Sequence, residues 1–298
     1  MDIYQLVTDR ILQQLAAGTV PWRQTWTNGL PKSLTTGKEY RGINILLLNT
    51  APHQSRYWIT YREAQRQGGH VRKGERSTPV IFWKWRTPEE MAKQRAKTGK
   101  ESVAPCVPFV SAVFNLEQVE GIARPEDDSA PAAATALEVA GQLFDAMPDK
   151  PEIEHARNFQ PAYCQVTDRV LMPHLGQFET APEYFGTLFH ELVHSTGHPK
   201  RLKRFGETAE NPTARYSFEE LVAEFGAAFL CGIAGIQSRE TEELQAGYIA
   251  SWSRVFEKDN RILLRAASAA QRAVDYIRGG KIAETVYEKP AEPEAIAA

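Results

Sequence analysis

Residues 189–198, FHELVHSTGH, contain the pattern His-Glu-x-x-His. On a helix, side chains four positions apart share a face, so His190 and His194 can direct a ring nitrogen at one ion. Glu191 then lies beside that ion and can take a proton from water bound to it. The pattern therefore predicts a continuous helix over about 181–197 that carries a metal site. The alternative is an ordinary helix with two solvated histidines.

A second helix offers the missing ligand. The segment 217–230, SFEELVAEFGAAFL, holds acids within a very apolar sequence. Such carboxylates are costly unless they are paired or bound to metal. This segment resembles the second metal-binding helix of thermolysin-like gluzincin peptidases. By that resemblance Glu220 is the third ligand, and Glu224 orients a ligand histidine. An exchange of these two roles is an open alternative, as is a helix whose acids are merely solvated.

The residues after the motif refine the expected site. A metzincin peptidase would have a third histidine at position 200, where this chain has Lys200. We therefore expect His198 beside the metal site and not as a ligand, with a hypothetical role toward substrate or an oxyanion. The segment 165–173, QVTDRVLMP, is a candidate edge strand for a peptide substrate. Two histidines and a carboxylate favour Zn²⁺, although Mn²⁺ or another divalent ion suits the same ligands.

Charge divides the chain into a basic front and an acidic back. Residues 1–124 carry 18 Lys and Arg against 10 Asp and Glu, whereas the remainder carries 17 against 27. Between the halves, 125–136 is rich in Pro, Ala and Asp, which predicts a linker. We predict an α+β protein with a small mixed α/β domain at 1–124, a mainly helical zincin-like domain at 137–285, and a disordered tail at 286–298.

Aromatic and basic residues interleave in the front domain, which holds five of the six tryptophans. Single-stranded nucleic acid needs cations for its phosphates and aromatic faces for its bases. The alternative is that most of these aromatics fill the core of a small domain. The candidates for DNA contact are Trp22, Arg23, Trp26, Lys38, Tyr40, Arg41, Asn44, Arg56, Trp58, Tyr61, Arg62, Arg72, Lys73 and Arg76.

Local patterns predict most of the elements. Segment 43–49, INILLLN, is a buried helix or strand that periodicity does not decide. Segment 86–102 is highly charged, and we expect a mobile connector there. Helices are predicted at 2–17, 60–69, 137–147, 216–233 and 241–278, and strands at 78–85, 106–115, 152–156 and 161–171.

Long segments also resemble one family. YQLVTDRILQQLAAGTVPW, TGKEYRGINILLL, RYWITYREAQRQGGHVRKGERSTPV and FNLEQVEG are similar to the N-terminal domain of ArdC-type antirestriction proteins, which also occurs on TraC-type plasmid primases. HELVHSTGHPKRL and EELVAEFGAAFL resemble the zincin-like metallopeptidase domain that accompanies it. The resemblance implies a plasmid-borne protein that binds single-stranded DNA and helps conjugative DNA survive the recipient's restriction enzymes. It does not imply a peptide substrate with equal strength.

Two functions are therefore carried forward. In the first, the front domain binds single-stranded DNA, while a zinc site with Glu191 as general base acts on a host restriction component. In the second, the chain protects DNA by binding it, and the metal site is structural or vestigial. A nuclease is disfavoured, because nuclease sites cluster carboxylates around two metals. No apolar run reaches the roughly 18–20 residues of a membrane span, and the N-terminus does not read as a signal peptide, so we expect a cytoplasmic protein without a membrane partner.

Overall fold

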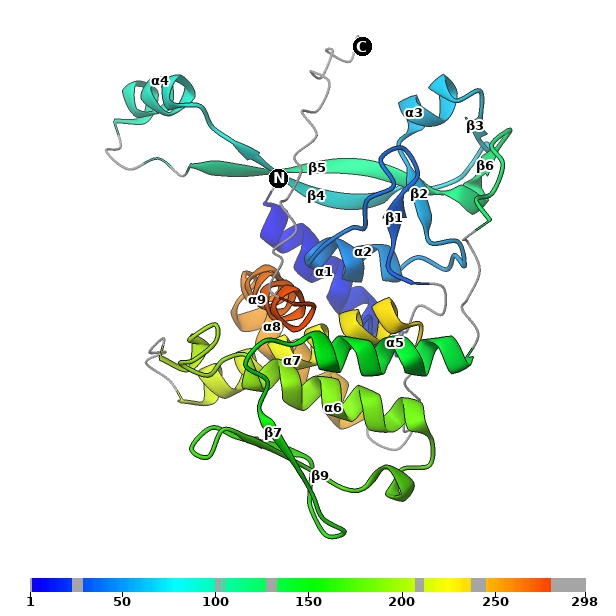
Figure 1. The fold of residues 1–298 in the computed structure, drawn as a ribbon. Helices are drawn as coiled ribbons and strands as arrows, with labels where there is room; N and C mark the ends of the chain where they lie inside the picture. The colour runs from blue at the N-terminus through cyan, green and yellow to red at the C-terminus, as the bar shows by residue number, and fades with distance from the viewer. Residues whose placement is uncertain are drawn as a thin grey trace.

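The computed structural model describes residues 2–22, 29–99, 103, 105–126, 133–206, 212–236 and 245–279 (Figure 1). Helices and strands are mixed in the front of the chain and helices dominate the back, which confirms the α+β class. Within the described residues, no helix is long and apolar enough to cross a membrane. The predicted tail, 286–298, lies outside the described residues.

The front half is built on a four-stranded sheet of order β1-β2-β5-β4. Strands β4 and β5 are antiparallel and pair over the full length of β4, from Thr78 opposite Val113 to Trp85 opposite Cys106. Strands β3 and β6 form a two-stranded ladder at the end of the front half opposite α4 (Figure 1). The elements are α1 (Ile3–Ala16), β1 (Lys32–Ser33), α2 (Ile43–Asn49), β2 (Tyr57–Ile59), α3 (Tyr61–Arg66), β3 (His70–Val71), β4 (Thr78–Trp85), α4 (Pro88–Thr98), β5 (Cys106–Asn115) and β6 (Val119–Glu120).

The undecided segment 43–49 is the helix α2, and six of its seven residues are buried. Asn44 is fixed on both sides of its amide, because its Nδ2 donates to the Ile81 carbonyl at 2.7 Å and its Oδ1 accepts from the Ile81 N–H at 2.6 Å. These two bonds tie α2 to the middle of β4. A buried polar side chain with both bonds satisfied stabilises this arrangement.

The expectation of a mobile connector at 86–102 is wrong where the structure describes it, because α4 occupies 88–98. Thr87 accepts from the Glu90 N–H, and the Glu90 carboxylate accepts from the Thr87 N–H, forming a capping box. Gly99 closes the helix at a φ of 66°, which glycine adopts without strain. Local capping signals therefore produce a helix inside a strongly charged segment.

The back half places helices beside a small sheet. Its strands have the order β7-β9-β8, with β9 in the centre. This overturns the expectation that 165–173 forms an edge strand, because β9 pairs on both sides and β8 lies at the edge. The elements are α5 (Ala133–Ala146), β7 (Glu152–His155), β8 (Ala162–Cys164), β9 (Arg169–Met172), α6 (Ala181–Ser195), α7 (Pro212–Ala234), α8 (Gln245–Lys258) and α9 (Ile262–Ile277).

Two boundaries in the back half differ from expectation. Helix α5 begins at Ala133, inside the predicted linker. The single helix expected at 241–278 is the pair α8 and α9, because the chain turns at 259–261. There the Asp259 carboxylate accepts from the Arg261 N–H, an Asx-type turn that competes with helix continuation.

One hydrophobic core joins the two halves of the chain. It includes Val7, Ile11 and Leu15 of α1 together with buried residues of α6, α7 and α9. Trp22 lies within it and is 2% exposed. The front half therefore rests on the helices of the back half and shares their core (Figure 1).

Gly226 sets the separation of α6 and α7. A Cβ atom built there would lie 2.6 Å from Val193 Cγ2, closer than real contacts permit. Gly226→Ala is expected to force the helices apart and to lower the free energy of unfolding by roughly 1–3 kcal/mol. Denaturant unfolding checks this result. Gly247→Ala on α8 is the matched control, since nothing lies within 4 Å of that position. Equal stability of the two variants would contradict the prediction.

Candidate metal centre

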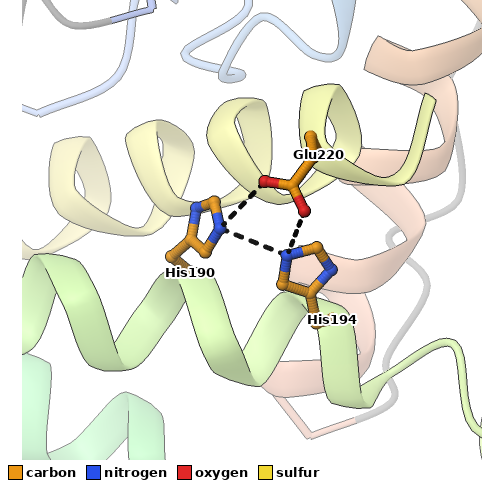
Figure 2. A group of neighbouring side chains, drawn as sticks. All are labelled: His190, His194 and Glu220. Atoms are coloured by element: carbon orange, nitrogen blue, oxygen red, sulfur yellow. Dashed lines mark hydrogen bonds and ion pairs between the residues drawn. The ribbon is translucent and has the colours of Figure 1, made fainter. Parts of the chain in front are cut away.

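The expected helix of the metal motif is α6, at 181–195. Thr180 and Glu183 form a capping box at the N-terminus of α6. The capping box fixes where the helix begins, and therefore which side chains share each of its faces. His190 and His194 project from this helix toward Glu220 of α7 (Figure 2). The pairing of these two helices thus brings the three side chains together, although 30 positions separate His190 from Glu220 in the sequence.

The spacing of the three side chains suits one ion. His190 Nε2 and His194 Nε2 lie 3.2 Å apart. The Glu220 carboxylate lies 3.7 Å from the first nitrogen and 3.5 Å from the second (Figure 2). Ligands about 2.1 Å from a tetrahedral ion are about 3.4 Å from one another. The donor set and the distances therefore fit a four-coordinate divalent ion, with one position left for water or substrate.

Burial keeps His194 in the neutral form that can bind a metal. Burial, with smaller effects of His190 and Arg204, lowers the pKa of His194 to about 3. Its imidazole is therefore neutral near pH 7 and offers a lone pair. Burial raises the pKa of Glu220, while His190 and a hydrogen bond from Tyr216 act in the opposite direction. A cation placed among these groups would favour the carboxylate form.

Glu191 stands beside the three donors and is 7% exposed. Burial raises the pKa of its carboxyl group, although His190 and the backbone N–H of Tyr163 oppose the shift. A carboxylate whose pKa is raised toward neutral is a better proton acceptor in catalysis. Because Tyr163 belongs to β8, the edge strand borders this carboxylate directly.

Arg204 locks the two helices that carry the donors. Its guanidinium donates to Thr196 Oγ1 at 2.7 Å and to the Val193 carbonyl at 2.9 Å, both at the end of α6. It also pairs with Glu219 of α7 at 3.2 Å, with both side chains buried. A fully bonded buried ion pair specifies geometry more than it adds stability. It fixes the position of Glu220, one residue on.

The other predicted site residues lie outside the group of three donors. Glu224 is one turn further along α7 and half-buried. His198 lies in the loop after α6, where its Nδ1 accepts from the Lys200 N–H at 3.2 Å and lies 3.9 Å from Asp168. Of the two acids left open by the sequence, Glu220 is the one that meets the histidines.

Sequence reasoning missed three groups around the site. Tyr216 hydrogen-bonds Glu220, and its position four residues earlier on α7 was a usable signal. The role of Arg204 becomes visible only in the folded protein, where α6 and α7 pack together. Tyr163 acts on Glu191 through its backbone, so no side-chain pattern could have revealed it.

The structure corrects several of the DNA-contact candidates. Trp22, Trp58 and Asn44 are buried at 2%, 3% and 8% exposure, so none of them can stack on or hydrogen-bond a base in this fold. They serve the core, because a small domain uses its large side chains to fill it. Arg23 and Trp26 lie outside the described residues.

Three further candidates are engaged within the protein. Arg41 forms an ion pair with Asp275 of α9. Arg56 is half-buried and donates to the Leu30 carbonyl at 3.3 Å. Tyr40 packs against a small apolar cluster that includes Trp58.

The six remaining candidates are exposed, and five of them gather at one end of the front half. We call this the α3–β3 surface, and it consists of Tyr61, Arg62, Arg72, Lys73 and Arg76. Tyr61 is 49% exposed and lies near Phe114, with ring centroids 6.4 Å apart. Lys38 is also exposed, in the turn between β1 and α2. The basic character expected of the front half is thus present on its surface at this end.

Comparison with known proteins defines the class. Residues 1–114 match the family model of the N-terminal domain of anti-restriction factor ArdC. Residues 140–269 match the model of a zincin-like metallopeptidase. The chain therefore combines an antirestriction-type front domain with a zincin-like domain that carries its two histidines and glutamate on neighbouring helices.

Solved structures identify the family. The metal-free crystal structure of the antirestriction protein ArdC from plasmid R388 superposes with a TM-score of 0.73 at 34% identity, and covers 93% of this chain and 97% of that one. Its Mn(II)-bound form gives 0.74 at 33% identity over the same shares. The chain belongs to the ArdC antirestriction family.

Relatives in other contexts share most of this chain. Two DNA primases TraC of Escherichia coli are 34% and 32% identical over 92% of it. The chain spans only 27% and 20% of the length of these primases. Protein y4eC of Sinorhizobium fredii is 33% identical over 93% of this chain and 91% of its own length. The two-part unit thus occurs both within longer proteins and over nearly the whole of a shorter one.

Proposed function

We propose that this chain is an antirestriction protein that binds single-stranded DNA with its front domain, residues 1–124, and a divalent metal with its back domain, residues 137–285. It would protect incoming conjugative plasmid DNA from restriction in the recipient. The observation that carries the proposal is the assembly of His190, His194 and Glu220 around one point, with Glu191 beside them, in a chain of the ArdC family.

Zinc is the ion that two imidazoles and one carboxylate favour. The R388 ArdC protein binds Mn(II), and the same ligands would accept that ion in this chain. A bound divalent ion would polarise a carbonyl and make its water more acidic. Glu191 would accept the proton of that water. Tyr216, which hydrogen-bonds Glu220, would hold this carboxylate in position.

The substrate class that we propose for such chemistry is a host protein that meets the transferred DNA. An extended peptide would lie along β8, since this strand is at the edge of its sheet and its Tyr163 N–H reaches Glu191. Exposed strand edges pair with extended peptides through backbone hydrogen bonds. The front domain would bring the site to the DNA.

A second candidate is a DNA-binding protection protein without peptidase activity. The shared hydrophobic core favours it, because the back helices support the front half whether or not the metal site reacts. In that case the metal would stabilise α6 against α7. The two candidates differ only in whether Glu191 is needed.

Glu191→Gln separates the two functions, since it keeps the size of the side chain but removes the proton acceptor. If chemistry is required, we expect protection during conjugation into a restricting recipient to fall by about 100-fold or more, the usual worth of a general base. Glu257→Gln, an exposed substitution on α8, is the matched control. Metal content and unfolding of the variant must equal wild type. Full protection by such a variant would favour the second candidate.

A further inference from the structure

The outer part of the β4–β5 ribbon projects from the body of the protein and carries α4 at its end (Figure 1). We call this the arm, and define it as residues 82–99 and 105–109. Among the residues of α4, none is buried. The helix of the arm therefore adds nothing to the core.

Two aromatic side chains of the arm are exposed. Trp85 is 56% exposed and Phe82 is 37% exposed. Phe82 faces Phe109 across the ladder, with ring centroids 5.6 Å apart and planes 28° from parallel. Because successive strand residues point to opposite faces, Phe82 and Trp85 present rings on both sides of the ribbon. Exposed apolar groups collected in one place mark a binding surface.

Positive charge accompanies these rings. Residues 82–99 contain five Lys and Arg and two Asp and Glu. Lys84 pairs with Glu90 at 2.9 Å. Lys93, Arg95 and Lys97 on α4 are exposed, and no described acidic residue forms an ion pair with them. Lys93 and Lys97 are four positions apart and share a face of α4, whereas Arg95 lies on the opposite side, so positive charge surrounds the helix.

We propose that the arm is a binding surface for single-stranded DNA, with bases stacked on Trp85 and on the Phe82–Phe109 pair and phosphates held by Lys93, Arg95 and Lys97. The inference rests on the proposed DNA-binding function and places its main surface away from the α3–β3 surface. Unpaired bases expose the faces that such rings stack on, whereas a duplex hides them. The three cations supply the positive charge that a phosphate backbone requires.

The first test uses the full chain and a fluorescent thymidine oligonucleotide in an anisotropy titration. Trp85→Ala is expected to weaken binding by roughly tenfold, since one stacked base contributes about that factor. Trp85→Phe keeps a ring and should retain most of the affinity. Neither change should alter stability, because the side chain is more than half exposed.

The second test removes the charges. A K93A/R95A/K97A variant is expected to reduce the slope of log affinity against log salt by about 2, at about 0.7 for each contact on a single strand. The variant R254A/K258A/R272A removes equal charge from exposed positions on α8 and α9, and its slope should remain that of wild type. Equal losses in the two triple variants would overturn the arm as a site.

Failure of the inference and failure of the proposed function are distinguishable. If wild type does not bind the oligonucleotide at low salt, DNA binding itself is refuted. If wild type binds and the arm variants match it, while R62A/K73A/R76A loses affinity, the DNA lies on the α3–β3 surface and only the arm proposal fails. If the arm variants lose affinity and Trp85→Phe restores it, the arm is the site.

Discussion

Replacing His194 with alanine is expected to remove the divalent metal from the purified protein, from close to one ion per chain to essentially none. Two donors remain after this change, His190 and Glu220, and they lie 3.7 Å apart. Groups that merely orient metal ligands are worth about 10–100-fold in affinity, so loss of a ligand exceeds this range. Metal content by mass spectrometry after dialysis against zinc or manganese measures the result.

A pair of isosteric variants tests the third ligand. Glu220→Gln should lose the metal as His194→Ala does, whereas Glu224→Gln should keep it, because Glu224 is absent from the group of donors. His198→Ala is a further control in the loop after α6 and should also retain the ion. Metal loss in Glu224→Gln with retention in Glu220→Gln would reverse the assignment of the two acids.

Most of the metal site could be predicted from the sequence, because three of its residues lie on one helix. His190, Glu191 and His194 are fixed relative to one another by the helical repeat alone. Glu220 lies on another helix, and only the resemblance to a known metal-binding helix selected it over Glu224. What joins the helices, Gly226 against Val193 and Arg204 against Glu219, depends on tertiary packing that no local pattern encodes.

Elements of the fold that have clear local patterns could also be predicted from the sequence. The strands at 78–85 and 106–115 have the predicted bounds, because their β-branched and aromatic residues are flanked by breaks in the pattern. Segment 43–49 could not be decided, since a short run with five apolar residues out of seven suits a helix or a strand equally. Helix α4 was missed because its charge suggested a loop, although the Thr87–Glu90 capping box was present in the sequence.

The DNA-contact candidates were the least predictable, because composition does not tell which face of an aromatic ring is covered. Trp22 is a clear case. Its indole N–H donates to the Tyr248 hydroxyl at 3.0 Å, across 226 positions of the chain. By contrast Trp85, which lay outside the candidates, is the most exposed tryptophan for which the structure describes burial.

Trp22→Ala is therefore expected to destabilise the whole protein by about 3–5 kcal/mol, the range for removing a buried large aromatic side chain. Its ring lies edge-on to Phe225, Trp252 and Phe256, with centroids 5.2, 6.3 and 6.0 Å away. These partners belong to α7 and α8, so the cavity would open where the front half meets the back half. Chemical denaturation, compared with Trp85→Ala as an exposed control, measures the loss.

The same variant decides between a core and a DNA-contact role for Trp22. A core role predicts lower stability, with DNA affinity close to wild type under conditions where the variant is still folded. A contact role predicts unchanged stability and weakened DNA binding. Because Trp22 buries its ring against helices of the back half, we expect the first pattern. A fragment ending at residue 124 would expose this ring, so the front domain is best studied in the full chain, where its core is complete.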